Sequence, residues 1–263
     1  GIVLEGRNVT VKVASAASLI LGASSGTSTI TGWLKARGTG NAVTDGGALS
    51  VASITNITAT GQDVTFDHAS SNLQGALKIT GADVSVTHPT ALILGDSTVT
   101  GTYDIRTTTG DITDSGYLDI EGNSTFTTDA DGADITLDTT TNAFGTPTLG
   151  TVTVNTVGTG GDAEVHGGST NLKIIASGGV GTLTLTTTGG ASITDSGALV
   201  VLGATTIDAG TGNVTLDSAE NGTAHTNNLQ GAVGASGFNV SLTHPTTIDL
   251  GDSTVTGTYD VTA

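Results

Sequence analysis

The acidic residues of this sequence recur in short phrases. Neighbouring carboxylates with Arg or Lys beside them are what polysaccharide lyases and hydrolases need. The phrases are TD(S/G)G, GDS and TYD, and they contain Asp45, Asp114, Asp195, Asp96, Asp252, Asp104 and Asp260. Asp followed by Ser or Gly is also typical of turns, where the carboxylate accepts hydrogen bonds from the next backbone N–H groups. Catalysis and turn formation are therefore the two hypotheses for these acids.

A second acidic run, TTDADGADITLD, spans residues 127–138. Asp129, Asp131 and Asp134 offer hard oxygen ligands of the kind that calcium prefers. The order is not that of an EF-hand loop, because Gly132 comes too early and the terminal Glu is missing. The chain also lacks the GGxGxDxUx tandem that builds calcium-binding β-rolls. We expect a solvated loop here, with a weak calcium site as the alternative and no other cofactor.

Histidines are the next candidate metal ligands, and the chain has five: His68, His88, His166, His225 and His244. His88 and His244 each precede Pro in a THPT phrase, and a residue before Pro is held in an extended conformation. No His-x₃-His spacing indicates a zinc site. We therefore expect the histidines to mark strand ends or corners.

The single Trp lies in TGWLKARG at residues 31–38, beside two of the seven basic residues. An exposed Trp33 near Lys35 and Arg37 would be suited to contact a glycan or a protein. The alternative is that Trp33 fills an irregular part of the core. Thr-rich stretches such as TLTLTT at 182–187 offer further hydroxyls for glycans, although Thr is also a common strand residue.

The elements that position these residues belong to an internal repeat. VSVTHPTALILGDSTVTGTYDI at 84–105 and VSLTHPTTIDLGDSTVTGTYDV at 240–261 are identical at 17 of 22 positions, with an offset of 156 residues. The duplicated block extends over about 43–107 and 193–263. A partial copy, ITDSGYLDI, begins at residue 112. The second copy carries six extra residues within 218–227, which we expect to face solvent.

A shorter sequence repeat occurs inside the block. Gly is followed by an alternating strand in GADVSVT, GTYDIRT, GADITLD, GTLTLTT and GFNVSLT. Most spacings lie between 15 and 25 residues. Alternation with period two indicates strands with one buried face, and no helical spacing appears. We predict one continuous all-β domain over residues 1–263, a right-handed parallel β-helix or β-solenoid of about 14 rungs, with an antiparallel sandwich or barrel as the main alternative. Its length would be about 70 Å.

This geometry bears on the acids. On the predicted spacing, Asp96 and Asp252 lie about eight rungs, or roughly 40 Å, apart, so they cannot share one substrate or metal. Turn chemistry is the preferred hypothesis for these residues, and we expect no catalytic site.

Composition restricts the partners. The chain has 24 acidic and seven basic residues, for a net charge of −17, and it has no Cys. Nucleic-acid binding needs clustered Lys and Arg, and anionic lipid surfaces need the same, so neither partner is expected. No apolar run is long enough to span a membrane. Without Cys there is no disulfide framework and no thiolate chemistry.

The phrases ITDSGALVV, GNVTLD and GDSTVTGTYD resemble the repeat regions of filamentous-haemagglutinin-like proteins and other giant bacterial β-strand-repeat adhesins. The resemblance implies a right-handed parallel β-helix that is secreted to the bacterial cell surface. We therefore expect a non-enzymatic shaft of a surface adhesin or extracellular fibre, which associates head to tail and contacts host or matrix glycans or proteins. The alternatives are a β-helix carbohydrate-active enzyme and a glycan-binding module.

Overall fold

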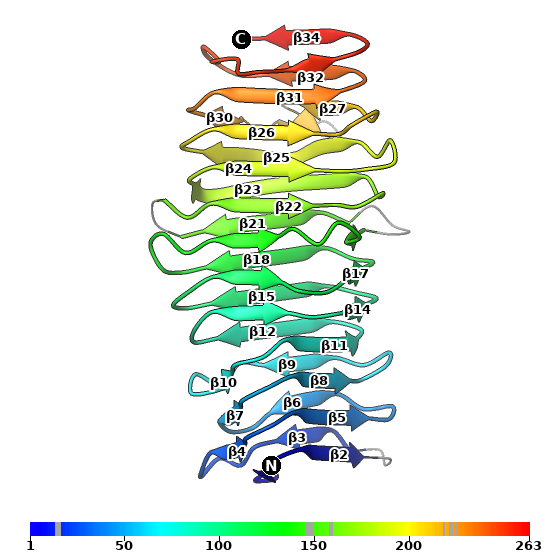
Figure 1. The fold of residues 1–263 in the computed structure, drawn as a ribbon, viewed down its shortest axis with the longest axis vertical. Coiled ribbons are helices and arrows are strands. Elements are labelled where there is room, and N and C mark those ends of the chain that lie inside the picture. Colours follow the sequence, from blue (N-terminus) through cyan, green and yellow to red (C-terminus); the bar gives the residue numbers. More distant parts are fainter. Residues whose placement is uncertain (14–16, 146–149, 158–159, 218, 221–222, 225) are drawn as a thin grey trace.

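The computed structural model is an elongated stack of short β-strands (Figure 1), and it describes residues 1–13, 17–145, 150–157, 160–217, 219–220, 223–224 and 226–263. No helix occurs in these residues. The chain winds along the stack and lays each turn on the one before it, so that neighbouring turns pair through parallel strands. The predicted all-β parallel solenoid is confirmed.

Two large sheets, A and C, run the length of the stack, and a four-stranded sheet B lies beside them at the N-terminal end. The strands of sheet A are β3 (Leu19–Leu21), β6 (Val43–Asp45), β9 (Val64–Phe66), β12 (Val84–His88), β15 (Tyr103–Thr107), β18 (Ser124–Thr128), β21 (Val152–Thr156), β23 (Leu172–Val180), β25 (Ile193–Val201), β27 (Val214–Leu216), β30 (Asn228–Leu229), β32 (Val240–Thr243) and β34 (Tyr259–Thr262). The strands of sheet B are β1 (Glu5–Gly6), β4 (Ser28–Ile30), β7 (Leu49–Val51) and β10 (Asn72–Leu73).

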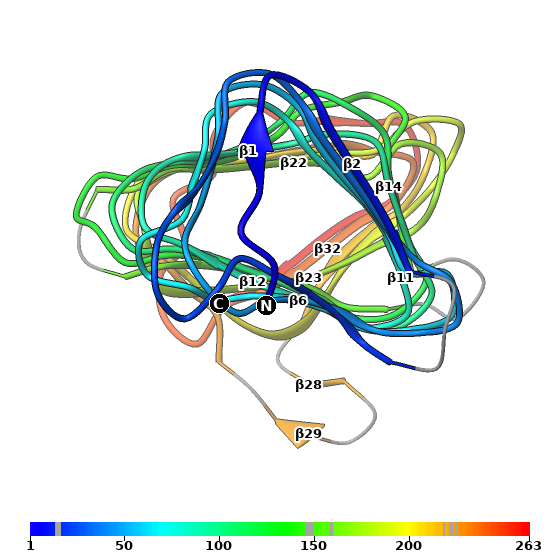
Figure 2. The ribbon, with the colours of Figure 1, turned by 90° about the horizontal axis from the view of Figure 1, so that it is seen from below.

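Sheet C has 15 strands. They are β2 (Val9–Val13), β5 (Leu34–Gly38), β8 (Thr55–Thr58), β11 (Leu77–Gly81), β13 (Leu92–Leu94), β14 (Ser97–Val99), β16 (Ile112–Asp114), β17 (Leu118–Ile120), β19 (Ile135–Leu137), β20 (Ala143–Phe144), β22 (Ala163–His166), β24 (Leu183–Thr186), β26 (Thr205–Asp208), β31 (Val233–Gly237) and β33 (Thr254–Val255). A separate antiparallel pair, β28 (Ala219–Glu220) and β29 (Thr223–Ala224), stands away from the stack (Figure 2). It lies in the predicted insertion, whose described part thus projects from the outline of the stack.

The solenoid has fewer turns than the spacing of the short Gly-strand repeat predicted. Twelve strands follow one another along sheet A, which corresponds to about 11 turns and not 14. Counting these short repeats overestimates the number of turns, because each turn contributes strands to at least two sheets. At about 4.8 Å per turn, 11 turns span about 53 Å and not 70 Å. In Figure 2, which looks along the stack from below, the chain runs clockwise as it recedes from the N-terminus, so the solenoid is right-handed.

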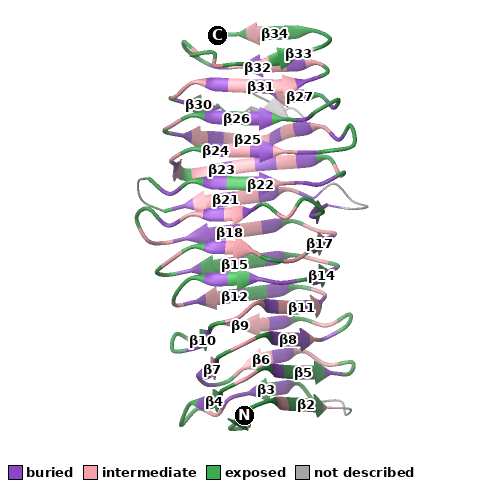
Figure 3. Cartoon of the chain, in the orientation of Figure 1, coloured by how far each residue is buried: buried purple, intermediate pink, exposed green. Residues whose placement is uncertain are grey.

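The length of a turn varies while the register of inward residues is kept. Val84 pairs with Tyr103, 19 residues later, whereas Ser124 pairs with Val152, 28 residues later. Extra residues are accommodated at the corners, because a shift of one residue within a strand would turn its apolar side chains outward. Along β5, buried and exposed residues alternate without interruption (Figure 3).

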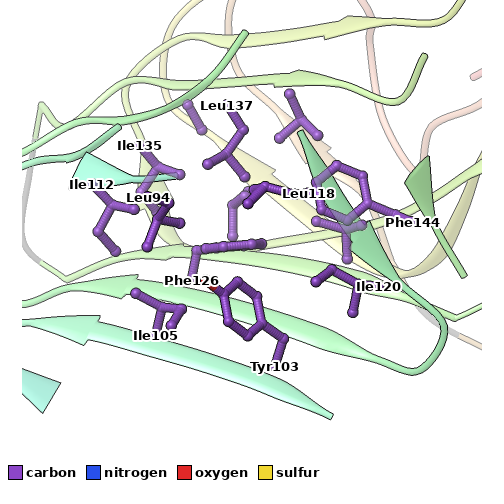
Figure 4. Close-up of a cluster of buried hydrophobic side chains, with 14 of the residues drawn as sticks. Leu94, Tyr103, Ile105, Ile112, Leu118, Ile120, Phe126, Ile135, Leu137 and Phe144 are labelled. Atoms are coloured by element: carbon purple, nitrogen blue, oxygen red, sulfur yellow. The ribbon is translucent and has the colours of Figure 1, made fainter. Parts of the chain in front are cut away.

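The core is a thin column of Leu, Ile and Val side chains, with three aromatic residues in its middle. Tyr103 and Phe126 lie on adjacent strands of sheet A with their ring centroids 5.9 Å apart, and Phe126 and Phe144 are 6.2 Å apart. Both contacts are edge-to-face, the favourable geometry for aromatic rings (Figure 4). Apart from Phe66, aliphatic residues fill the remaining turns, which explains how the chain folds with so few aromatic residues.

Candidate functional site

The carboxylates of the TD(S/G)G phrases hold one turn to the next. Asp45 Oδ1 accepts the N–H of Asp67 at 3.0 Å, and Asp45 Oδ2 accepts the N–H of His68 at 3.0 Å. These carboxylates accept backbone N–H groups, as predicted, but the partners differ from the prediction: the N–H groups come from the following turn, more than 20 residues later, and not from the next residues in the chain.

The second and third copies of the phrase add an Asn. Asn142 donates from Nδ2 to Asp114 Oδ2 at 2.6 Å and accepts the N–H of Leu118 on Oδ1 at 2.9 Å. Asn227 makes the same two bonds, to Asp195 Oδ2 at 2.6 Å and from the N–H of Leu199 at 2.9 Å.

We call each of these three-residue arrangements a clasp. In the first copy Ser71 takes the place of the Asn, because its Oγ accepts the N–H of Leu49 at 3.2 Å. In the first two copies the clasp connects the end of one strand, the start of the next and a loop of the following turn, whereas in the third copy Asp195 and Leu199 both lie within β25.

Burial raises the pKa of both Asp45 and Asp114, and hydrogen bonds from the following turn oppose part of that shift. For Asp114 the largest opposing contribution comes from the Asn142 amide. A raised carboxyl pKa also occurs in general acids. Here the Asp114 carboxylate oxygens accept hydrogen bonds from a backbone N–H and from the Asn142 amide inside the fold. The clasp therefore accounts for the burial of this carboxylate.

A second set of Asp and Asn side chains forms what we call the corner ladder. Each member lies directly before a strand, and its side-chain oxygen accepts the N–H of the equivalent residue one turn later. Thr102 donates to Asp83 at 2.7 Å, Asp162 to Asp134 at 2.8 Å, and Thr182 to Asp162 at 2.7 Å. Further such pairs are Asp83 with Asp63, Asp134 with Asp111, Thr151 with Asn123, Ser192 with Asn171, Asn239 with Asn213 and Thr258 with Asn239.

Asp96 and Asp252 keep their wide separation. Seven steps along sheet A lead from β12 to β32, so these equivalent acids lie about 34 Å apart rather than eight rungs and 40 Å. Asp96 forms a salt bridge to Lys78 Nζ at 2.5 Å and accepts the N–H of Tyr117 at 3.1 Å. The Lys78 hydrogen bond is the largest cause of a lowered pKa at Asp96. Burial raises the pKa of Asp104, whose repeat equivalent is Asp260.

The three candidate calcium ligands are engaged separately. Asp129 forms a salt bridge with Arg106 at 2.9 Å, and Asp134 belongs to the corner ladder. Asp131, on the intervening loop, has interactions of its own. Within the described residues, no group of three or more His, Cys, Asp or Glu side chains is arranged to hold a metal ion. The calcium hypothesis stays a prediction and carries none of the proposals below.

The THPT histidines brace the fold. His88 Nε2 accepts the N–H of Leu73 at 3.1 Å, and its Nδ1 lies 2.9 Å from the carbonyl oxygen of Thr90. Nδ1 must therefore carry the proton. His244 repeats the contact by accepting the N–H of Leu229 at 3.3 Å, beside a hollow of about 460 Å³. Burial lowers the pKa of His88. His225 lies outside the described residues.

Trp33 is exposed, which contradicts the alternative that it fills the core. The Trp33 and Ile54 side chains are 40% and 42% exposed, and they line a groove of about 320 Å³ together with Lys35 and Asn56. Two hydrogen bonds to the preceding turn hold the backbone of Trp33. Its carbonyl accepts the N–H of Val9 at 3.0 Å, and its N–H donates to the side-chain oxygen Oδ1 of Asn8 at 3.2 Å.

Basic residues gather on the same outer face of sheet C. Thr10 and Lys12 of β2 pair with Lys35 and Arg37 of β5. Lys35 then pairs with Asn56 of β8, and Asn56 with Lys78 of β11. We call the outward residues Lys12, Trp33, Lys35, Arg37, Ile54, Asn56 and Lys78 the basic face.

Three segments, 6–80, 81–151 and 148–236, match the model of a family described as Repeats of unknown function (DUF5649). The chain belongs to this family. No curated protein and no solved structure matches it. Each DUF5649 segment contains one TD(S/G)G phrase, at Asp45, Asp114 and Asp195 respectively.

Sequence reasoning missed two features of these DUF5649 repeats. The corner ladder has a signal, since Asp or Asn stands before the strand in GQDV, GADV and GFNV. The second feature is the position of Lys12 and Lys78 on the same face as Lys35. It has no signal in the sequence, because the number of residues between paired positions differs from turn to turn.

No helix of the described residues is long and apolar enough to cross a membrane.

Proposed function

We propose that this chain is a non-enzymatic shaft segment of a secreted bacterial surface adhesin or extracellular fibre. The observation that carries the proposal is the use of its acids. The carboxylates of Asp45 and Asp114 and of the corner ladder accept hydrogen bonds from the next turn, as expected of a scaffold. The fold of repeated turns and the resemblance of its phrases to adhesin repeats add support.

Location and activity test this proposal separately. Antibodies against the chain should label intact producing cells or their extracellular filaments, and added protease should remove the label. Labelling that appears only after the cells are lysed contradicts the proposed location. Purified chain should release no fragments from neutral or acidic polysaccharides between about pH 4 and about pH 9. Cleavage that is lost in Asp114→Asn would make the chain an enzyme.

Head-to-tail association of this polypeptide is part of the proposal. Strands β2 and β3 at one end, and β33 and β34 at the other, have a pairing neighbour on one side among the described strands. Unpaired edges are templates for another chain, while repulsion between bodies of net charge −17 opposes contact. Scattering particles should therefore lengthen between about 10 mM and about 500 mM salt, because the Debye length shrinks. A monomer at both salt concentrations contradicts this part.

A further inference from the structure

The basic face reverses the charge of the molecule locally. Four of the seven cations, Lys12, Lys35, Arg37 and Lys78, lie within four consecutive strands of one sheet, on β2, β5 and β11, in a chain with 24 acids. Lys35 and Arg37 alternate with the fully buried Ala36, so both point outward. If the seven bases were distributed at random over the surface, most of them would be surrounded by acids. Their clustering makes this face a distinct electrostatic feature.

Three of these cations are available to a ligand. Lys78 is paired with Asp96. Among the described residues, no carboxylate lies within salt-bridge distance of Lys12, Lys35 or Arg37. A ligand with negative charges would supply the missing partners.

An apolar groove adjoins the cations. Trp33 shares its strand face with Lys35, and Ile54 lies beside Trp33 on the next turn. Asn56 and Ser53 also line the groove and provide amide and hydroxyl groups. The groove combines a flat aromatic surface, hydrogen-bonding groups and a cation, which together suit a ring that carries hydroxyls and a negative charge.

We propose that the basic face binds an acidic polysaccharide, with a sugar ring against Trp33 and its carboxylate or sulfate groups on Lys35, Arg37 and Lys12. Lys12 and Arg37 pair on adjacent strands, which lie about 4.8 Å apart, and Lys35 lies on the same strand as Arg37. A polymer with several negative charges can contact all three cations and gains affinity from several weak contacts. Single-stranded nucleic acid is the less suitable polyanion, because it uses several aromatic platforms and this face has Trp33 alone.

The inference deepens the proposed function, and it rests on that proposal for placing the chain outside the cell. Binding itself is a property of the purified chain, so the two can fail separately. Absence of binding overturns the inference and leaves the shaft proposal standing. Failure of surface labelling does the reverse.

Tryptophan fluorescence tests the inference directly, because Trp33 is the sole Trp of the chain. Titration with polygalacturonate at about 20 mM salt should shift the emission and give saturable binding, and about 500 mM salt should weaken it. Neutral dextran should cause no change. No saturable response to polygalacturonate or to heparin overturns the inference.

Variants locate the site. The double variant Lys35→Gln, Arg37→Gln should bind polygalacturonate at least about ten-fold more weakly, and Trp33→Ala should show a similar loss by calorimetry. Lys173→Gln removes one charge from another part of the chain and serves as the control, with unchanged binding. Circular dichroism should show that all variants are folded, since the altered side chains point outward.

Three results contradict the inference. The first is a loss of affinity in Lys173→Gln that is as large, for each charge removed, as the loss in the double variant, which would indicate a response to net charge alone. The second is tighter binding of single-stranded DNA than of either polysaccharide. The third is salt-sensitive dimerisation that the double variant abolishes, with no polysaccharide bound, which would make a second copy the occupant.

Discussion

The first and third DUF5649 segments share an interior and differ on the outside. In both segments, the Asp of the TD(S/G)G phrase accepts a backbone N–H from the following turn. A polar side chain also accepts the N–H of a Leu in each segment: Ser71 accepts that of Leu49 in the first, and Asn227 accepts that of Leu199 in the third. Segment 6–80 has five bases and three acids, for a net charge of +2, while segment 148–236 has one base and six acids, for a net charge of −5.

The difference separates what folds the chain from what distinguishes its parts. Inward residues and clasps recur because each turn must be buried against the next one. Outward residues are free of that requirement, so their divergence carries the functional information. The intermediate segment 81–151, with 11 acids and Arg106 as its one base, shows that the cations of the first segment are not a general property of the repeat.

The largest effect should come from the interior. Phe126→Ala removes the central ring of the aromatic column and should lower the free energy of unfolding by about 3–5 kcal/mol. Trp33→Ala removes an exposed aromatic side chain and should change it by less than about 0.5 kcal/mol. Urea unfolding followed by circular dichroism measures both. Equal losses would mean that the outer face also stabilises the fold.

The clasp should come next. Asn227→Ala leaves the Leu199 N–H and an Asp195 oxygen without the Asn227 side chain as partner, at a cost of about 1–3 kcal/mol. Asn227→Ser reproduces the first segment, where Ser71 holds Leu49, and should recover part of that loss. Urea midpoints of the two variants provide the comparison. If Ser is as damaging as Ala, the first and third clasps are not equivalent.

A smaller effect should appear with pH. The pKa of His88 is lowered in the folded chain, so the unfolded chain takes up a proton first as the pH falls below about 6.5. The stability from neutral His88 is therefore complete above about pH 6.5 and is lost as the pH falls through the folded pKa.

His88→Gln removes that titration and should flatten the decrease of the urea midpoint between about pH 7 and about pH 5. Asp45 and Asp114 have raised pKa values and act in the opposite sense, favouring the folded chain as they protonate. They are present in both proteins and cancel in the comparison. Identical pH profiles would show that His88 does not contribute.

A small effect should also follow from shortening the insertion. Deletion of residues 219–224 gives the third segment a loop of the same length as the first and keeps Asn227 in the clasp. The free energy of unfolding should change by less than about 1 kcal/mol, because loop length contributes little. Thermal unfolding measures this change. Loss of the β spectrum would show that the insertion supports the stack.

The sequence was sufficient to predict the solenoid, because period-two strands after Gly and a duplicated block leave few alternatives. The number of turns was overestimated because strands on different faces of one turn look alike in the sequence. The structural role of the acids was predicted, but their partners were not. A hydrogen bond from Asp67 to Asp45 depends on the length of a turn, which varies with the corners.

Trp33 shows the same limit on the surface. Its proximity to Lys35 and Arg37 was expected because the three residues lie close together in TGWLKARG. Its exposure and its groove with Ile54 depend on the pairing of β5 with β8, which no local pattern specifies.

Hydrogen exchange tests most directly the central claim that polar side chains of one turn hold the backbone of another. The amides of Leu118 and Leu199 donate to Asn142 and Asn227 and should exchange as slowly as strand amides that donate to backbone carbonyls of a neighbouring strand. Asn227→Ala should speed exchange at Leu199 and leave Leu118 unchanged. Fast, loop-like exchange at both Leu amides in the unmodified chain would contradict the account.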